Sequence, residues 1–170
     1  MQDKYLLSLD GGGVRQIATI TFLSKLEKEL NCPLYDKFDY FIGTSAGGIT
    51  AMALAVQNLN SNGLHELWSE KNLEKTLDAS SWESKLGLLQ INPKYSGEGK
   101  KEVLKENFGN LKMGDASKDL AVVSYDLEKR KPILLTSYND PDISLIDAGN
   151  ATSAAPIYYP TAKVGKRYLI

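Results

Sequence analysis

The chain contains few of the residues that build disulfides, metal sites and histidine-based catalysis. It has one cysteine, Cys32, and one histidine, His65. A single cysteine excludes an internal disulfide and a cysteine-based metal site. Because His65 lies at the start of an ordinary amphipathic helix, we expect a structural or surface role for it, which argues against a Ser-His-Asp triad.

The chain also has no excess of one charge and no long apolar run. Its 20 basic and 21 acidic residues leave a net charge of -1, and no basic stripe is interleaved with aromatic residues, so nucleic acid is not expected as a partner. No run approaches the roughly 20 apolar residues that span a bilayer, and the N-terminus resembles no secretory signal. We expect a cytoplasmic or membrane-peripheral protein, while export without a cleaved signal stays open.

Residues 1–170 fit one domain, and the apolar share of 42% is enough for a hydrophobic core. The first part of the chain repeats one order of elements, a short apolar strand, a glycine-rich turn and a helix. This order predicts parallel strands joined by crossovers, the mark of an α/β fold. The expected elements are strands at 5–9 and 38–42 and helices at 17–30 and 49–59.

The second part of the chain predicts further helices and strands around one irregular segment. That segment, 79–96, is interpreted as an excursion that could form a lid. We expect helices at 63–77, 99–108 and 147–155, adjacent strands at 120–125 and 133–136, and a last apolar run at 168–170.

One of the two glycine-rich turns, Gly43-Thr44-Ser45-Ala46-Gly47-Gly48, lies between a strand and a helix. In that context a Gly-x-Ser-x-Gly match is meaningful, because the serine occupies a strained turn that lifts its hydroxyl to the edge of the sheet. Gly43 and Gly47 remove the side-chain clashes that so sharp a turn would create. Ser45 is therefore a candidate nucleophile.

The other turn, Asp10-Gly11-Gly12-Gly13-Val14-Arg15, also joins a strand to a helix. Three residues without side chains allow backbone amides to face an incoming oxygen, as an oxyanion hole requires. Phosphate binding and a purely structural role are the alternatives. A dinucleotide fingerprint would need glycine where the chain has Gln16, and no Gly-Lys-Ser/Thr ending is present. Parallel strands would bring both turns to one sheet edge, which outlines an acyl-transfer site.

These motifs resemble the patatin-like phospholipase family. The matching segments are Asp10 to Arg15, Gly43 to Gly48 and Ala151-Thr152-Ser153-Ala154-Ala155-Pro156, with Phe38 to Ile42 and Tyr95 to Gly99 as further family positions. The resemblance implies a three-layer α/β/α fold with a mainly parallel central sheet, and hydrolysis of fatty acyl esters of phospholipids or lysophospholipids without metal or cofactor. It assigns Ser45 as the nucleophile, the amides of Gly11, Gly12 and Gly13 as oxyanion donors, and a place for Arg15 near that hole. A solvated cation in the first helical turn is the alternative for Arg15.

The family uses a Ser-Asp dyad, and its aspartate follows the strand after the Ala-Ser-Pro segment. Here that strand would be 167–170, so we expect the catalytic aspartate beyond Ile170 and little activity from the chain as it stands. Asp147, in Asp147-Ala148-Gly149, superficially fits the aspartate motif of the family. However, it precedes the Ala151 to Pro156 segment, whereas the family's aspartate follows it. A helix-cap role is therefore expected for Asp147.

Three alternatives to a lipid acyl hydrolase stay open. They are a general carboxylesterase or thioesterase that uses the same serine, a catalytically lapsed lipid-binding module, and a nucleotide-binding module. Several apolar and aromatic residues could line an acyl cleft or a membrane-facing lid, or pack as ordinary core and cap, namely Trp68, Trp82, Leu86, Leu88, Leu89, Tyr158 and Tyr159. Acyl-lipid substrates and peripheral membrane contact are the expected partners; oligomeric state is not encoded.

Overall fold

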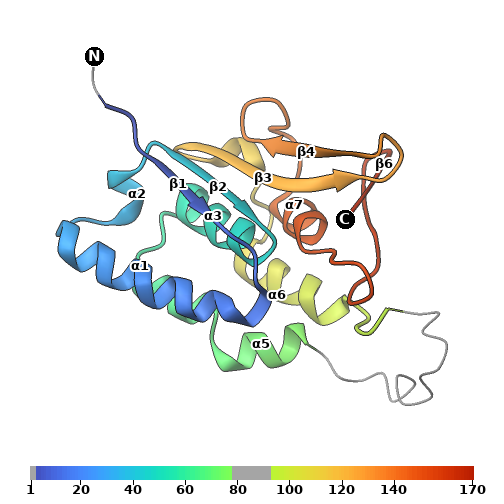
Figure 1. Cartoon of the computed structure of the whole chain (residues 1–170), viewed down its shortest axis with the longest axis horizontal. Helices are drawn as coiled ribbons and strands as arrows, with labels where there is room; N and C mark the ends of the chain where they lie inside the picture. Colours follow the sequence, from blue (N-terminus) through green and yellow to red (C-terminus); the bar gives the residue numbers. More distant parts are fainter. Residues whose placement is uncertain (1–2, 78–92) are drawn as a thin grey trace.

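The computed structural model describes residues 3–77 and 93–170 of the chain. Most of the irregular segment expected at 79–96 lies outside these residues, as do Trp82, Leu86, Leu88 and Leu89. The described residues form a mixed sheet with helices packed behind it in the view of Figure 1.

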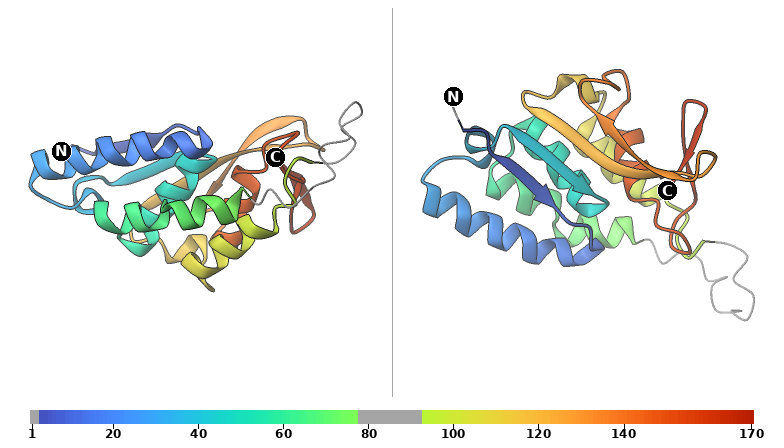
Figure 2. Two further views of the ribbon diagram at one scale, coloured as in Figure 1. Left: turned by 90° about the horizontal axis from the view of Figure 1, so that it is seen from below. Right: turned by 45° about the horizontal axis from the view of Figure 1, so that its top comes forward.

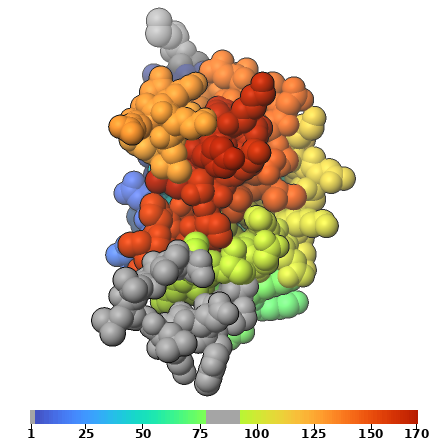
Figure 3. Space-filling model, turned by 90° about the vertical axis from the view of Figure 1, so that its right-hand side faces the viewer, coloured from blue at the N-terminus to red at the C-terminus, as the bar shows by residue number. Residues whose placement is uncertain are grey.

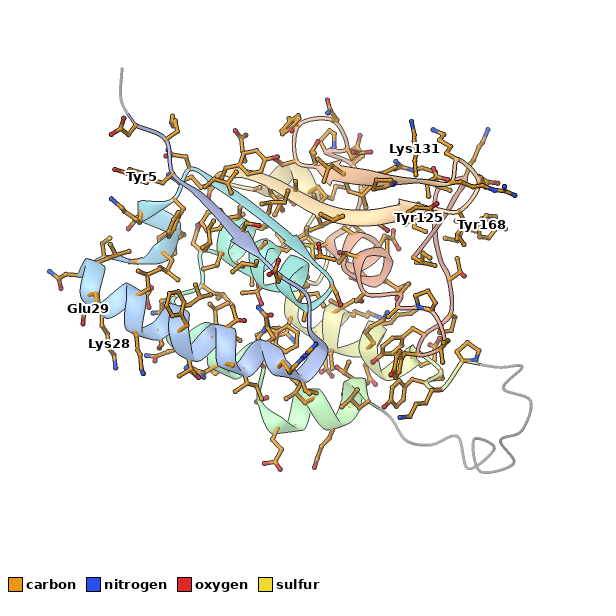
Figure 4. The ribbon with its side chains drawn as sticks, in the orientation of Figure 1. Tyr5, Lys28, Glu29, Tyr125, Lys131 and Tyr168 are labelled. Carbon is orange, nitrogen blue, oxygen red and sulfur yellow. The ribbon has the colours of Figure 1, made fainter. Side chains whose placement is uncertain are left out.

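The first part of the chain alternates strands with helices, as its sequence predicts. Strand β1 leads through a short 3-10 turn into α1, and β2 leads directly into α3. Lys28 and Glu29 project outward from α1, as expected for its polar side (Figure 4). The elements are β1 (Leu6–Leu9), η1 (Gly13–Arg15), α1 (Gln16–Leu30), α2 (Leu34–Lys37), β2 (Tyr40–Thr44), α3 (Ala46–Gln57), α4 (Ser61–Leu67) and α5 (Glu70–Thr76).

The remaining elements follow residue 92. The two strands expected at 120–125 and 133–136 form an antiparallel hairpin, β3 and β4, and a short second hairpin, β5 and β6, lies near the end of the chain. The elements are α6 (Glu98–Phe108), η3 (Met113–Asp115), β3 (Asp119–Asp126), β4 (Lys131–Thr136), α7 (Leu145–Thr152), β5 (Ala162–Val164) and β6 (Arg167–Leu169). Within the described residues, no helix is both long and apolar enough to cross a membrane.

The strands form one sheet in the order β1-β2-β3-β6-β5, with β4 paired to the other side of β3. At its core the sheet is parallel, because β2 lies between β1 and β3 and runs in the same direction as both. The parallel core confirms the α/β class predicted from the repeated strand, turn and helix order. Beyond this core, β4 and β6 each pair antiparallel with β3, and β5 pairs antiparallel with β6.

Helices cover one face of the sheet in the described part of the chain. In Figure 1, α3 and α7 lie behind the strands, and the buried Phe41, Leu120 and Val122 belong to the hydrophobic core with residues of both helices. Strand residues of the opposite face are more open, and Leu6 and Leu134 are 57% and 49% exposed. Of the three layers that the resemblance implies, the described residues therefore form two, the sheet and one layer of helices (Figure 2).

Two helices differ from the sequence-based expectation. The segment 63–77 forms two helices, α4 and α5, because Trp68 and Ser69 leave the helical path and Ser69 begins α5 in an extended conformation. Helix α3 begins at Ala46 and includes Gly47 and Gly48, which were assigned to the turn. Both glycines are buried in tight contacts, so close packing explains them better than chain reversal does.

Segments far apart in the sequence meet beside α6. The backbone amides of Lys94 and Tyr95 donate to the carbonyls of Ile157 and Tyr158 at 2.8 and 2.9 Å. Figure 3 shows this side of the molecule, with the C-terminal residues in red beside the yellow-green start of α6. At the far end of β3, Tyr125 and Tyr168 from neighbouring strands lie near each other on the surface (Figure 4).

Candidate active site

Ser45 occupies a strained turn between β2 and α3. Its backbone angles are φ 53° and ψ -124°, a region that residues with side chains rarely adopt. It is the N-cap residue of α3, so the positive end of the helix dipole lies next to its side chain. The residue is half-buried and lines a cavity. The turn that the Gly-x-Ser-x-Gly pattern predicts is therefore present.

Gly43 and Gly47 are required by packing at this turn. A Cβ atom on Gly43 would overlap the backbone of Gly47, and a Cβ atom on Gly47 would overlap the carbonyl oxygen of Leu9. Backbone atoms of a hydrogen-bonded strand and a buried helix cannot move aside cheaply. The two glycines thus allow the start of α3 to lie directly against the ends of β1 and β2.

The backbone of Ser45 is held from the other side by Thr152, at the end of α7. Its N–H donates to Thr152 Oγ1 at 2.9 Å, and the same hydroxyl donates to the carbonyl of Val123 on β3. Thr152 is 6% exposed, so these bonds are shielded from water. Thr152 belongs to the family segment Ala151 to Pro156, but the sequence predicts no role for it, because no local pattern shows a contact 107 residues away.

The triple-glycine turn lies beside the serine turn. Leu9 pairs with Gly43 across the parallel strands, and a Cβ atom on Gly11 would lie 3.1 Å from the Cβ of Ser45. Gly13 has a φ of 56°, which favours glycine, and both Gly12 and Gly13 line the cavity with Ser45. The structure thus brings together the two turns that the sequence placed at one sheet edge.

Arg15 ends η1, is the N-cap residue of α1 and lines the same cavity. It is exposed, and its Nε lies 3.5 Å from the carbonyl oxygen of Gly12, a long hydrogen bond within its own turn. It therefore lies beside the triple-glycine turn. Whether Arg15 acts on a substrate stays a prediction.

The cavity has a volume of about 630 Å³, and most of its lining residues are apolar. Its walls come from the two turns, from α4 and α5, from α6, and from the segment after α7. Trp68, Tyr158 and Tyr159 all line it, so these three belong to the cavity wall and not to the interior core alone. A volume of this size accommodates a small-molecule ligand or an acyl chain.

Among the described residues that line the cavity, none is histidine, aspartate or glutamate. His65 is exposed on α4 and is not a lining residue, in agreement with the expected surface role. The helix-cap role expected for Asp147 is wrong in detail, because Ser144 is the N-cap of α7 and its Oγ accepts the Asp147 N–H at 3.0 Å. Asp147 is instead an exposed residue of the first turn.

Lys100 is a cavity residue that the sequence analysis did not single out. It is 3% exposed, and burial lowers the pKa of its ammonium group to about 7, with a smaller contribution from the charge of Lys101. The sequence carried a signal, because Lys100 precedes the buried Val103, Leu104 and Phe108 at helical spacing. A lysine on the apolar side of an amphipathic helix is unusual.

Comparisons with known proteins agree with the motifs and the fold. The cGAMP-activated phospholipase of Pseudomonas aeruginosa is 31% identical over 165 residues, which cover 94% of this chain and 49% of that protein. Patatin-like protein 4 of Arabidopsis thaliana is also 31% identical, over 93% of this chain and 44% of that protein. The chain spans about half the length of the curated relatives it matches.

Among solved structures, VipD of Legionella pneumophila superposes with a TM-score of 0.66 at 16% identity, covering 98% of this chain and 45% of that one. This likeness supports a patatin-like fold. The sequence model of the patatin-like phospholipase family matches residues 7–170. The chain belongs to the patatin-like phospholipase family.

Proposed function

We propose that Ser45 is the nucleophile of a lipid acyl hydrolase that cleaves fatty acyl esters of phospholipids or lysophospholipids. The observation that carries the proposal is the strained turn of Ser45, which shares one largely apolar cavity with Gly12 and Gly13. Membership of the family supports lipid hydrolysis as the general activity. The cavity offers a hydrocarbon chain an apolar wall next to the hydroxyl.

In this mechanism, Ser45 Oγ attacks the ester carbonyl while its proton passes to a general base. The backbone N–H groups of Gly11, Gly12 and Gly13 hold the negative oxygen of the tetrahedral intermediate. The ester C–O bond then breaks, the leaving alkoxide takes up the proton, and an acyl-enzyme remains. Water attacks the acyl-enzyme with help from the same base and releases the fatty acid.

The base is the part of the mechanism that the described cavity lining does not supply. The dyad hypothesis assigns it to an aspartate that is not among the described lining residues. Free aspartate has a pKa of about 3.9 and is a weak base, so the proposal requires a desolvated carboxylate in contact with Ser45.

Substrate would enter from a lipid surface. Val14 and Tyr158 line the cavity and are also 46% and 49% exposed, so apolar groups stand at its mouth. Exposed aromatic and aliphatic side chains of this kind favour the interface between water and lipid. We propose a peripheral contact of this rim with membranes or lipid aggregates.

Labelling with a fluorophosphonate tests the nucleophile directly. We expect the probe to label Ser45, and Ser45→Ala to lose the label and to lower ester turnover by at least about 1,000-fold in protein that supports turnover. Ser8→Ala, an exposed serine on β1, serves as the control and should keep both. Turnover that persists in Ser45→Ala would reject the assignment.

The same protein preparations distinguish this function from two alternatives. A panel of short-chain esters, acyl thioesters, lysophospholipids and phospholipids distinguishes a lipid hydrolase from a general carboxylesterase or thioesterase. The absence of an acid or histidine among the described lining residues favours a catalytically lapsed lipid-binding module as the second candidate. Such a module would bind lipid but would resist the fluorophosphonate.

A further inference from the structure

Lys100 places a buried positive charge in the wall of the Ser45 cavity. The side chain leaves α6 on the side that also carries the buried Val103 and Leu104, and all three residues line the cavity. Only 3% of Lys100 is exposed, far less than of Arg15, the other cation that lines the described cavity. Lysine is almost never this buried unless its charge has a partner.

The partners of Lys100 in the described structure are neutral. Its Nζ donates to the carbonyl oxygen of Ser153 at 3.1 Å and, at the long distance of 3.4 Å, to that of Asn150. The same atom lies 4.1 Å from the centre of the Tyr159 ring. Carbonyl dipoles at a helix C-terminus and an aromatic face both attract a cation, but neither neutralises it.

No carboxylate of the described residues lies within ion-pair distance of Lys100. The contrast with other lysines is clear, because Lys75 and Lys101 have glutamates at 2.8 and 3.3 Å. Nor does any aspartate or glutamate line the cavity in the described part of the chain. The cavity therefore combines an apolar wall with unneutralised positive charge, which is complementary to an amphipathic anion.

Burial makes a positive charge with only neutral partners costly at this position. Desolvation, with a smaller effect from Lys101, holds the pKa of the Lys100 ammonium near 7, so the charged form is poorly supported by its present surroundings. A negative group that entered the cavity would favour the charged form and would gain a charge-assisted hydrogen bond away from water.

We propose that Lys100 is an anion subsite of the Ser45 cavity, which binds one negatively charged oxyacid group of an amphiphile whose hydrocarbon chain lies against the apolar wall. The inference rests on the proposed function, since it names the substrate class of the same cavity. The anion has two sources, the phosphodiester of an intact phospholipid or the carboxylate of a released fatty acid. In either case Lys100 selects ligands that carry charge over neutral esters.

Binding by calorimetry tests the subsite without any turnover. The probes are dodecyl methyl phosphate, which carries a single negative charge, and its neutral counterpart dodecyl dimethyl phosphate. Near pH 6 we expect the wild-type chain to bind the anion at least tenfold more tightly. Dodecanoate, as a third probe, tells whether a carboxylate is accepted as well as a phosphodiester.

Three variants assign the preference to Lys100. Lys100→Met should reduce the affinity for the anionic phosphate at least tenfold and leave the affinity for the neutral ester within about twofold. Lys100→Arg, which keeps the charge, should retain most of the preference. Lys101→Met is the matched control, because it removes an exposed lysine one residue away that is paired with Glu98, and it should change neither affinity.

The outcomes separate this inference from the proposed hydrolase activity. Equal binding of both phosphates by the wild-type chain, or an equal loss of both in a folded Lys100→Met, would overturn the subsite and leave the lysine with a packing role. If circular dichroism shows that Lys100→Met is unfolded, Lys100→Gln replaces it. The comparison of the anionic and neutral phosphates on the wild-type chain tests the subsite in either case. In protein that contains the proposed general base, a preference for the anion together with resistance to the fluorophosphonate would support the subsite and reject the hydrolase.

Discussion

The backbone N–H of Ser45 is bonded to the side-chain oxygen of Thr152 at 2.9 Å, although 107 residues separate them in the sequence. Thr152 Oγ1 in turn donates to the carbonyl of Val123, so one hydroxyl links the serine turn, α7 and β3. A contact of this kind fixes the strained turn from outside the local motif. Through Thr152, the Ala151 to Pro156 segment therefore supports the turn that carries Ser45.

Thr152→Val tests that link. Valine has a similar shape but accepts no hydrogen bond, so the Ser45 N–H would be left without its partner in a mostly buried position. We expect a loss of about 1 to 3 kcal/mol in the free energy of unfolding. In protein that supports turnover, kcat should fall about tenfold or more with little change in KM, because the nucleophile is less well positioned.

Thr152→Ser is the matched control for this experiment, since it keeps the hydroxyl. Urea unfolding and steady-state kinetics measure the two effects. Wild-type kcat in a folded Thr152→Val would show that Thr152 does not position the turn.

Gly47→Ala tests the packing of the turn against β1. The added Cβ would overlap the carbonyl oxygen of Leu9 and lie 2.6 Å from that of Asp10. Because both are backbone atoms, we expect a destabilisation of at least about 3 kcal/mol, or failure to fold. Gly63→Ala in α4 is the control, because its nearest neighbours are side-chain atoms of Leu59, and its effect on thermal stability should stay within about 1 kcal/mol.

Thr50→Val tests a hydrogen-bond centre behind the cavity wall. The Thr50 hydroxyl accepts from Gln16 Nε2 at 3.0 Å and from Trp68 Nε1 at 3.1 Å, and donates to the carbonyl of Ala46. Valine would leave two donors without an acceptor, at a cost of about 2 to 4 kcal/mol in the free energy of unfolding. Thr50→Ser should recover most of it, and a stability loss below about 0.5 kcal/mol in the valine variant would contradict the role.

The lowered pKa of Lys100 predicts a pH dependence of stability. The folded chain releases this proton near pH 7, while the unfolded chain holds it up to about 10.5. Between these values the unfolded state binds more protons, so the free energy of unfolding should rise with pH. The contribution reaches at most about 1.4 kcal/mol per pH unit, and it disappears below pH 7.

The groups that face Lys100 indicate that Lys100 itself causes this pH dependence of stability. Lys101, on the same helix, lowers the pKa of Lys100 by charge repulsion. From α7 and the segment after it, Lys100 faces carbonyl groups and the Tyr159 ring. Lys75 of α5 forms ion pairs with Glu102 and Glu106. Urea unfolding at several pH values between 7 and 9.5 measures the slope. Lys100→Met should show a smaller slope than the wild-type chain. Equal slopes of the free energy of unfolding against pH in the two proteins would mean that the pKa of Lys100 is not lowered by folding.

Local sequence patterns were sufficient for the two turns and for the parallel core of the sheet. The glycines around Ser45 and the triple glycine have meaning within a few residues, because backbone strain and side-chain clashes are local. The alternation of short apolar strands with helices likewise predicts crossovers and hence parallel pairing. The resemblance to the family rests on these same motifs, and the family model over residues 7–170 confirms it.

Tertiary structure decided what meets at those turns. Trp68, where the helix breaks, donates a hydrogen bond to Thr50 on α3, and no helical periodicity records this contact. Thr152 reaches Ser45 because α7 packs against α3 and β3, and Lys100 reaches the carbonyls at the end of α7 because α6 packs against α7. Motifs define the strained backbone of the candidate nucleophile, whereas long-range packing defines the support, the walls and the charge of its cavity, since burial and electrostatics depend on neighbours in space.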